Sequence, residues 1–128
     1  QTMCESNARS EGVSERCRFL HGDARKLDFP DETFDAVVSN YVYHNINGSD
    51  KQALLLESLR VLKKGGVFAL NDNMKPHMYG NMEAFAENLR KMGYQEVRII
   101  DTAQEAFGSH RRAALMMLGD SRMLAGRK

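Results

Sequence analysis

Short apolar runs separated by polar turns predict alternating strands and helices along this chain. The clearest strand is 34–40, whose nearly continuous apolar run is rich in β-branched residues, as expected for a parallel strand covered on both faces. A second strand is predicted over 17–22, where Phe19 and Leu20 stand between polar boundaries. Each run ends in small polar residues. This pattern is typical of strands that present polar groups to a ligand at the carboxyl ends of a sheet.

Apolar positions at helical spacing predict the helices. Residues 1–11 are compatible with the tail of a helix that stops at Gly12. Ser49 and Gln52 form a capping box, and Gly65-Gly66 supplies a left-handed stop. Between them lies a leucine stripe: Leu55, Leu56, Leu59 and Leu62. A second helix is predicted over residues 81–92 and ends at Gly93. Its apolar stripe consists of Met82, Phe85, Leu89 and Met92.

Three further strands complete the predicted sheet. Residues 67–70 follow the glycine pair, which implies a right-handed crossover onto a parallel sheet. The next two strands, 94–101 and 110–118, are joined by eight residues, too few for a crossover helix, so this pair should be antiparallel. The run 115–118, Leu-Met-Met-Leu, is expected to be buried strand. The predicted class is α/β, a three-layer αβα sheet with an antiparallel C-terminal strand pair.

Composition limits the domain count and the partners. A chain of 128 residues forms one domain at most. Its 18 Lys and Arg balance 17 Asp and Glu, so no general attraction to nucleic acid or to a membrane is expected. Cys4 and Cys17 occur without a secretory or membrane-spanning segment, which favours a reducing, cytoplasmic compartment. His21, His77 and His110 are dispersed and lack metal-ligand spacing with the cysteines, so no metal site is predicted.

Four sequence motifs, in order and spacing, carry a family resemblance. They are Gly22-Asp23-Ala24, Leu27-Asp28-Phe29-Pro30-Asp31, Phe34-Asp35-Ala36-Val37-Val38-Ser39, and Glu57-x-x-Arg60-Val61-Leu62-Lys63-x-Gly65-Gly66. Together they resemble the class I S-adenosylmethionine-dependent methyltransferases, in the small-molecule branch that includes quinone-biosynthesis enzymes. The resemblance covers the chain from about residue 7 to about residue 118. It implies a Rossmann-like seven-stranded sheet whose last two strands are antiparallel, and S-adenosylmethionine as the cofactor.

The resemblance assigns the cofactor-binding residues. Asp23 would accept a hydrogen bond from the adenine amine, and the backbone N–H of Ala24 would bind a ring nitrogen. Alternatively, Asp23 caps the turn that follows it, as Asx side chains commonly do. Ser39 and Asn40 would face the methionine portion of the cofactor.

The resemblance also places catalytic candidates after the strand 34–40. Tyr41, Val42 and Tyr43 would line the place where the methyl group meets its acceptor. For Tyr41 and Tyr43 the alternative is packing under the next loop. His44 is the acid/base candidate because it titrates near neutrality and follows a strand end, and a structural or exposed histidine is the alternative. Asp72, Asn73 and the loop 74–80 would lie near the acceptor, unless that loop is an ordinary connector.

The family's first strand, its glycine-rich loop and its second strand would all precede Gln1, so 1–128 is predicted to be a single partial methyltransferase domain. The expected function is methyl transfer to a small-molecule acceptor, as the C-terminal part of the catalytic domain. The strand end Ser-Asn-Tyr-Val-Tyr, 39–43, differs from the Asn/Asp-Pro-Pro-Tyr of amino-methylating nucleic-acid enzymes. The alternative is a non-catalytic fragment or interaction module that forms a homo-oligomer through open sheet edges. A dinucleotide oxidoreductase would need a Gly-x-Gly-x-x-Gly turn, which the sequence lacks.

Overall fold

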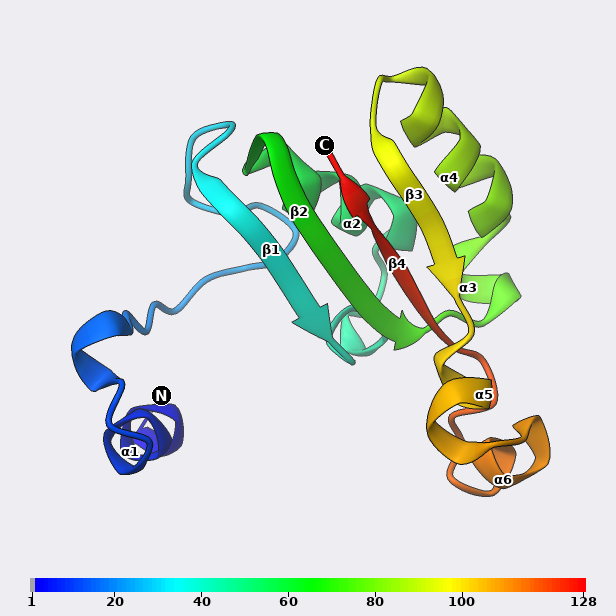
Figure 1. Cartoon of the computed structure of the whole chain (residues 1–128), viewed down its shortest axis with the longest axis horizontal. Helices are drawn as coiled ribbons and strands as arrows, with labels where there is room; N and C mark the ends of the chain where they lie inside the picture. Colours follow the sequence, from blue (N-terminus) through cyan, green and yellow to red (C-terminus); the bar gives the residue numbers. More distant parts are fainter. Residues whose placement is uncertain (1) are drawn as a thin grey trace.

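A computed structural model describes residues 2–128 and shows a mixed four-stranded sheet with its larger helices behind it (Figure 1). The strand order is β1-β2-β4-β3. The elements are α1 (Thr2–Ser10), η1 (Ser14–Arg16), β1 (Phe34–Asn40), η2 (Tyr43–Asn45), α2 (Lys51–Arg60), β2 (Leu62–Asn73), α3 (Pro76–Tyr79), α4 (Met82–Lys91), β3 (Gln95–Ile100), α5 (Thr102–Phe107), α6 (His110–Leu115) and β4 (Ser121–Arg127).

The sheet contains the parallel pair and the antiparallel pair that the sequence predicts, although two of the predicted strands differ. β1 and β2 are parallel and are joined by α2, whereas β4 runs antiparallel to both β2 and β3. The Rossmann-like α/β class and the antiparallel C-terminal pair are therefore confirmed. The structure shows two of the three predicted layers, because the buried side chains of α2 and α4 belong to one cluster with those of the sheet, and α2 lies behind the sheet in Figure 1.

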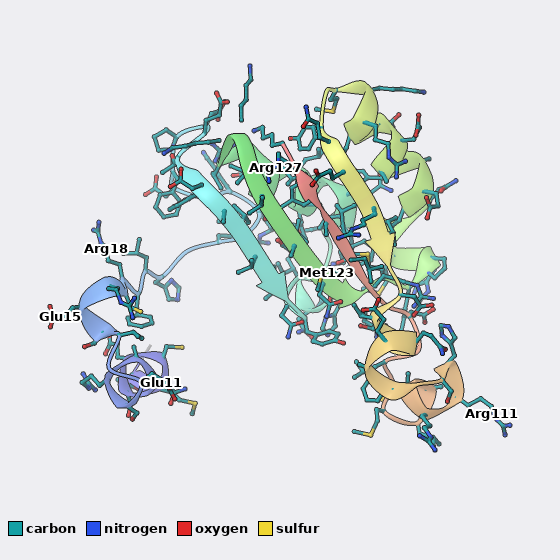
Figure 2. The ribbon with its side chains drawn as sticks, in the orientation of Figure 1. Glu11, Glu15, Arg18, Arg111, Met123 and Arg127 are labelled. Carbon is teal, nitrogen blue, oxygen red and sulfur yellow. The ribbon has the colours of Figure 1, made fainter. Side chains whose placement is uncertain are left out.

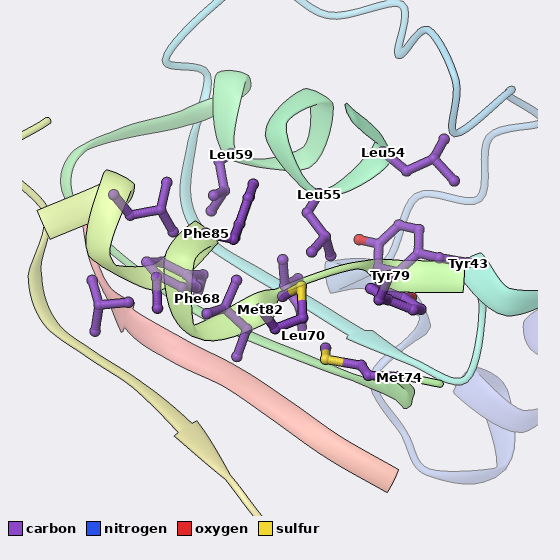
Figure 3. Close-up of a cluster of buried hydrophobic side chains, with 14 of the residues drawn as sticks. Tyr43, Leu54, Leu55, Leu59, Phe68, Leu70, Met74, Tyr79, Met82 and Phe85 are labelled. Atoms are coloured by element: carbon purple, nitrogen blue, oxygen red, sulfur yellow. The ribbon is translucent and has the colours of Figure 1, made fainter. Parts of the chain in front are cut away.

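The core lies between the sheet and the helices α2, α3 and α4 (Figure 3). Its members come from all of these elements: Tyr43, Leu54, Leu55, Leu59, Leu62, Phe68, Leu70, Met74, Tyr79, Met82, Phe85, Ala86, Leu89, Val97 and Leu124. The α4 stripe is confirmed at Met82, Phe85 and Leu89, but Met92 is exposed because it caps the helix end. In α2 the buried stripe includes Leu54 in place of Leu56, which is exposed.

The prediction that β1 is covered on both faces is wrong. β1 pairs only with β2, so it is an edge strand in the described structure. Val38 is 79% exposed, and Val67, which pairs with Ala36 on the same face of the sheet, is 43% exposed. No helix of the described chain packs over these side chains. An apolar run thus marks a strand correctly, but whether a second layer covers it depends on other elements.

Residues 17–22 do not form the predicted strand. The structure assigns no strand to this segment, and an isolated bridge joins Asp23 and Lys26 just after it. A strand requires a partner for its backbone hydrogen bonds, and β1 is the nearest strand in sequence but pairs elsewhere. Apolar residues alone therefore do not form a strand here.

The glycine pair has a different role from the predicted helix stop. α2 begins after Asp50, whose carboxylate accepts from the backbone N–H of Gln52 and Ala53, and ends at Arg60. Gly65 and Gly66 lie within β2, where Gly65 has φ +81°. A Cβ on Gly66 would meet Leu62 Cδ1 at 2.5 Å and the Asp35 carbonyl oxygen at 2.8 Å. Gly66 is needed because β2 passes close to β1 at this point.

The strand predicted over 110–118 is wrong. Residues 110–115 form helix α6, and the antiparallel partner of β3 is β4, nearer the end of the chain. Leu115, Met116 and Met117 are exposed rather than buried. Ser109 explains the helix, since its hydroxyl caps α6 by accepting from the backbone N–H of Arg112. The hairpin was thus predicted with the correct direction but the wrong second strand.

Candidate active site

The strongest polar cluster joins the carboxyl ends of the two parallel strands. His44 follows β1, and Asp72 lies near the end of β2. His44 Nδ1 is 2.5 Å from Asp72 Oδ1, and the His44 backbone N–H donates to Asp72 Oδ2 at 2.8 Å. The Asp72 side chain is fully buried, whereas that of His44 is 29% exposed. The two residues form a dyad with a sheltered carboxylate and an accessible imidazole.

Other donors keep the Asp72 carboxylate in place. Tyr79, in α3, donates its hydroxyl to Asp72 Oδ2 at 2.5 Å, and the Asn73 backbone N–H donates to Oδ1 at 2.8 Å. Burial and the neighbouring Asp72 raise the pKa of Tyr79, so its hydroxyl stays a neutral donor throughout the physiological range. Both carboxylate oxygens thus have donors, which is what a buried carboxylate requires.

The hydrogen bonds imply which tautomer His44 adopts. Asp72 Oδ1 can only accept when the carboxylate is ionised, so Nδ1 of His44 carries the proton. In the neutral imidazole Nε2 is then the unprotonated nitrogen, and the described residues place no hydrogen-bond partner on it. An imidazole held in this tautomer by a carboxylate can accept a proton at Nε2.

Tyr41 starts a second polar network, on the opposite face of the sheet. Its hydroxyl lies 2.7 Å from Ser121 Oγ, which in turn lies 2.8 Å from Thr102 Oγ1. Thr102 donates to Asn71 Oδ1, and Asn71 Nδ2 donates to Asn40 Oδ1. Because the Thr102 proton points to Asn71, Ser121 donates to Thr102 and Tyr41 donates to Ser121. The network ties the ends of β1, β2 and β4 together.

Tyr41 also contacts the dyad. Its backbone has φ +54°, in the left-handed region, and its N–H donates to the Asn71 carbonyl at 2.9 Å. The rings of Tyr41 and His44 meet edge to face, with centroids 6.4 Å apart. A strained backbone held by these contacts is common at functional sites. The structure therefore brings two of the three predicted catalytic side chains together.

Tyr43 lies elsewhere. It is buried in the core under α2 (Figure 3), and its hydroxyl is 2.8 Å from Ser58 Oγ. Of the two alternatives, lining the acceptor site or packing under the next segment, the structure shows packing. Tyr43 is therefore not available to touch an acceptor, because its ring faces Leu54 and its neighbours rather than solvent.

Asp23 and Ala24 form a tight turn whose carboxylate is paired locally. Arg25 contacts both Asp23 oxygens, at 3.0 Å from Nε and 2.8 Å from Nη2, and its backbone N–H donates to Asp23 Oδ1. The hydrogen bonds from Arg25 lower the pKa of Asp23 to about 2. The Asx-turn alternative for Asp23 is thus present in the structure. It does not exclude adenine recognition, because each carboxylate oxygen can accept more than one hydrogen bond.

A hollow of about 760 Å³ opens beside this turn and provides a test of cofactor fit. Val42 and Ile46 supply apolar surface, whereas Asp23 and Asn47 supply polar groups. An adenine has flat apolar faces and a polar edge, so this lining suits it. Ala24 belongs to the same lining. Asp23, Ala24, Val42, Ile46 and Asn47 are accordingly the residues that would hold the adenine of a nucleoside cofactor.

Ser39 and Asn40 end β1 on opposite faces of the sheet. Ser39 points to the same side as the half-buried Val37, and Asn40 lies with Val38 on the uncovered side, where it accepts from Asn71. Only Asn40 joins the polar network. Near it, Asn73 Oδ1 is buried with no partner among residues 2–128, whereas Asn73 Nδ2 donates to the Met117 carbonyl.

Two residues of the Glu57-x-x-Arg60 motif hold the acidic turn against α2. Arg60 Nη1 donates to the Phe29 carbonyl and to Asp31 Oδ1, both at 2.8 Å, and Nη2 donates to the Leu27 carbonyl. Glu57 Oε1 accepts from the Leu27 backbone N–H at 2.7 Å. The hydrogen bond from Arg60 lowers the pKa of Glu57. Sequence reasoning missed this role, although the spacing on one helix face and the acidic turn were both visible.

Proteins of the Rossmann-like class bind their ligands at the carboxyl ends of parallel strands, where this structure places its polar groups. Comparison with known proteins specifies the family. The sequence profile of the family described as "Methyltransferase domain" matches residues 1–70. The chain belongs to this methyltransferase family, which implies S-adenosylmethionine as its cofactor.

Curated relatives align with part of their length. A sterol 24-C-methyltransferase of Gibberella zeae is 31% identical over 83 residues, 65% of this chain and 21% of that protein. The 27-O-demethylrifamycin SV methyltransferase of Amycolatopsis mediterranei is 30% identical over 102 residues, 80% of this chain and 36% of that protein. A demethylmenaquinone methyltransferase of Bacillus subtilis is 33% identical over 75 residues, 59% of this chain and 31% of that protein. The chain thus spans about a fifth to a third of these relatives.

Solved structures share the fold. The cyclase SpnF superposes with a TM-score of 0.62 at 21% identity, covering 99% of this chain and 62% of that chain. An S-adenosylmethionine-dependent methyltransferase of Aquifex aeolicus has a TM-score of 0.53 at 16% identity, covering 94% and 59%. At such identities the likeness concerns the fold alone. The described part of this chain contains no helix of the length and apolarity that a membrane crossing requires.

Proposed function

We propose that this chain is the C-terminal part of a catalytic domain that transfers a methyl group from S-adenosylmethionine to a small-molecule acceptor. The observation that carries the proposal is the His44–Asp72 dyad, with Nδ1 and Oδ1 2.5 Å apart and a fully buried carboxylate. The family supports methyl transfer, and the relatives named above act, by their names, on sterols, a rifamycin derivative and demethylmenaquinone. The acceptor we infer carries a hydroxyl or amine whose proton must leave.

In this proposal His44 is the general base. S-adenosylmethionine, when bound, supplies a methyl group on a sulfonium, which is already activated for transfer. Nε2 of His44 would accept the proton that leaves the acceptor, and Asp72 would stabilise the resulting imidazolium. Tyr41 contacts the His44 ring and limits its orientation. Tyr79 and the Asn73 N–H donate to the Asp72 carboxylate and fix its orientation.

The cofactor is proposed to bind at the end of the site away from His44. Asp23 and Ala24 are proposed to contact the adenine, and Asn40, with Ser39 beside it, the methionine portion. The free cysteines Cys4 and Cys17 accord with the proposed reducing, cytoplasmic setting.

The test separates binding from chemistry. Calorimetric titration with S-adenosylmethionine measures affinity for the chain and for a longer form that includes preceding sequence. Methyl transfer is then measured against pH in the longer form with the His44→Gln variant. We expect a rate lower by about 10²–10⁴-fold with nearly unchanged cofactor affinity, because His44 acts on the acceptor proton. An unchanged rate would remove His44 from the mechanism.

A second function has its own support, since β1 leaves an apolar, unpaired edge. We propose that the chain alone self-associates through this edge, where Val38 is exposed. Sedimentation velocity of the 128-residue chain measures this directly. A cooperatively folded monomer at every concentration would contradict the self-association, and would leave the methyl-transfer proposal intact.

A further inference from the structure

The tip of the molecule, formed by α6 and the turn after it, buries a small residue and exposes large apolar ones. An ordinary surface helix does the opposite. Ala113 faces inward and is fully buried against α5, where Ala103 is also buried. The large side chains face solvent: Leu115 is 85% exposed, Met116 65% and Met117 76%. Soluble surfaces seldom present three consecutive large apolar residues, and such patches mark contact surfaces.

The same tip is basic. Arg111 and Arg112 precede the apolar residues, and the stretch 106–119 contains no Asp or Glu. Arg111 points away from the rest of the molecule (Figure 2). Within residues 2–128, the guanidinium groups of Arg111 and Arg112 form no ion pair or hydrogen bond. Three other arginines, Arg25, Arg60 and Arg90, each pair with a carboxylate. Two unpaired cations beside exposed apolar side chains complement a surface that is anionic outside and apolar inside.

The tip also adjoins the candidate site. The Met117 carbonyl accepts from Asn73 Nδ2 at 3.1 Å, and Asn73 directly follows Asp72 in β2. In Figure 1, α5 and α6 project beyond the sheet at the end where β2 and β3 terminate. Whatever the tip contacts is therefore held at the end of the sheet that carries the His44–Asp72 dyad.

We infer that Leu115, Met116 and Met117, with Arg111 and Arg112, form a docking surface for an anionic lipid bilayer. The apolar side chains enter the boundary between headgroups and acyl chains, and the arginines bind lipid phosphates. The net charge of the whole chain, +1, gives no indication of this surface, because acidic residues elsewhere cancel the local charge. Docking requires no transmembrane helix and places the mouth of the candidate site at the membrane surface.

The test is vesicle sedimentation with the 128-residue chain. Vesicles of phosphatidylcholine mixed with phosphatidylglycerol are compared with phosphatidylcholine alone. The patch variant is Leu115→Ser/Met116→Ser/Met117→Asn, with Asn at 117 because φ there is +59°. We expect the wild type to bind the mixed vesicles, and the patch variant to bind about tenfold or more weakly. Arg111→Gln/Arg112→Gln should lose several-fold on the mixed vesicles only, and added salt should reduce wild-type binding.

A matched control alters one leucine and two methionines that are exposed elsewhere. Met3→Ser/Leu20→Ser/Met92→Asn changes side chains that are between 64% and 76% exposed, and should leave vesicle binding unchanged. Circular dichroism checks that each variant folds, and Leu115→Ser alone replaces the patch variant if it does not. No binding by the wild type, or equal loss in the control, overturns the inference. So does self-association that the patch variant abolishes in the absence of vesicle binding.

Discussion

The two ends of the candidate site use the same chemical group in opposite ways. Asp72 is buried and is bound by two side chains of other elements: His44, 28 residues away, and Tyr79 in α3, seven residues away. Asp23 is half exposed and is bound by Arg25, two residues away. The buried carboxylate is part of the tertiary structure, whereas the exposed one is part of a local turn.

The comparison of Asp23 with Asp72 indicates that a carboxylate contributes more to the free energy of unfolding when it is buried. A carboxylate in water loses little when its partner is removed, because solvent replaces the partner. A buried carboxylate and its donors depend on one another, because no solvent reaches them. Three changes, ordered from the largest expected effect to the smallest, test this contrast.

The largest effect is expected for Asp72→Ala. The variant leaves the Tyr79 hydroxyl and the His44 and Asn73 N–H groups without their acceptor, in a place where water cannot substitute. We expect the free energy of unfolding to fall by about 3–5 kcal/mol, measured by urea denaturation. Asp28→Ala is the matched control, since Asp28 is exposed, and should change it by about 0.5 kcal/mol or less. Equal effects in the two variants would show that burial of Asp72 is not what matters.

An intermediate, local effect is expected for Arg60→Gln. The variant removes the donors to the Phe29 and Leu27 carbonyls and to Asp31, so the acidic turn separates from α2 more often. The Leu27 amide, which donates to Glu57, should exchange with deuterium about tenfold faster. Arg90→Gln, which breaks the comparable pair with Glu87, should leave Leu27 unaffected. Unchanged hydrogen exchange at the Leu27 amide in the Arg60 variant would contradict the role of Arg60 in holding the acidic turn against α2.

The smallest effect is expected at the exposed turn, for Arg25→Gln. The pKa of Asp23 is about 2 because Arg25 binds the carboxylate, and it should return toward 3.8 in the variant. Because the folded pKa is lowered, any stabilisation is fully present above pH 3.8 and is lost as the pH falls through about 2. Carboxyl chemical shifts of Asp23 against pH measure this. An Asp23 that still titrates near pH 2 in the variant would show that another group lowers its pKa.

Sequence reasoning succeeded where the signal is local. The helix over 82–91 was predicted from its stripe, and Asn81 caps it through the Ala84 N–H. The strand 34–40 was predicted with the bounds that β1 has. The placement of Asp72 and His44 near strand ends was also predicted, because the carboxyl ends of parallel strands meet at one edge of a sheet.

Sequence reasoning failed where one segment depends on another. The run 17–22 has strand-forming residues, yet the structure assigns no strand there. The run 110–118 is apolar enough for a strand, yet Ser109 caps a helix there and β4 takes the place beside β3. The burial of Tyr43 and Tyr79 and their hydrogen-bond partners likewise depend on how distant segments pack together.

The sequence by itself determined the α/β class, the family and the residue types available for chemistry, since these rest on periodicity and motifs that act over a few residues. Only the tertiary structure decided that Asp72 is buried between His44 and Tyr79, that Tyr43 belongs to the core, and that Leu115, Met116 and Met117 face solvent. The physical reason is that burial and partner choice are properties of pairs of distant segments. A local sequence pattern restricts which residues can be buried or paired, but it does not determine which of them are.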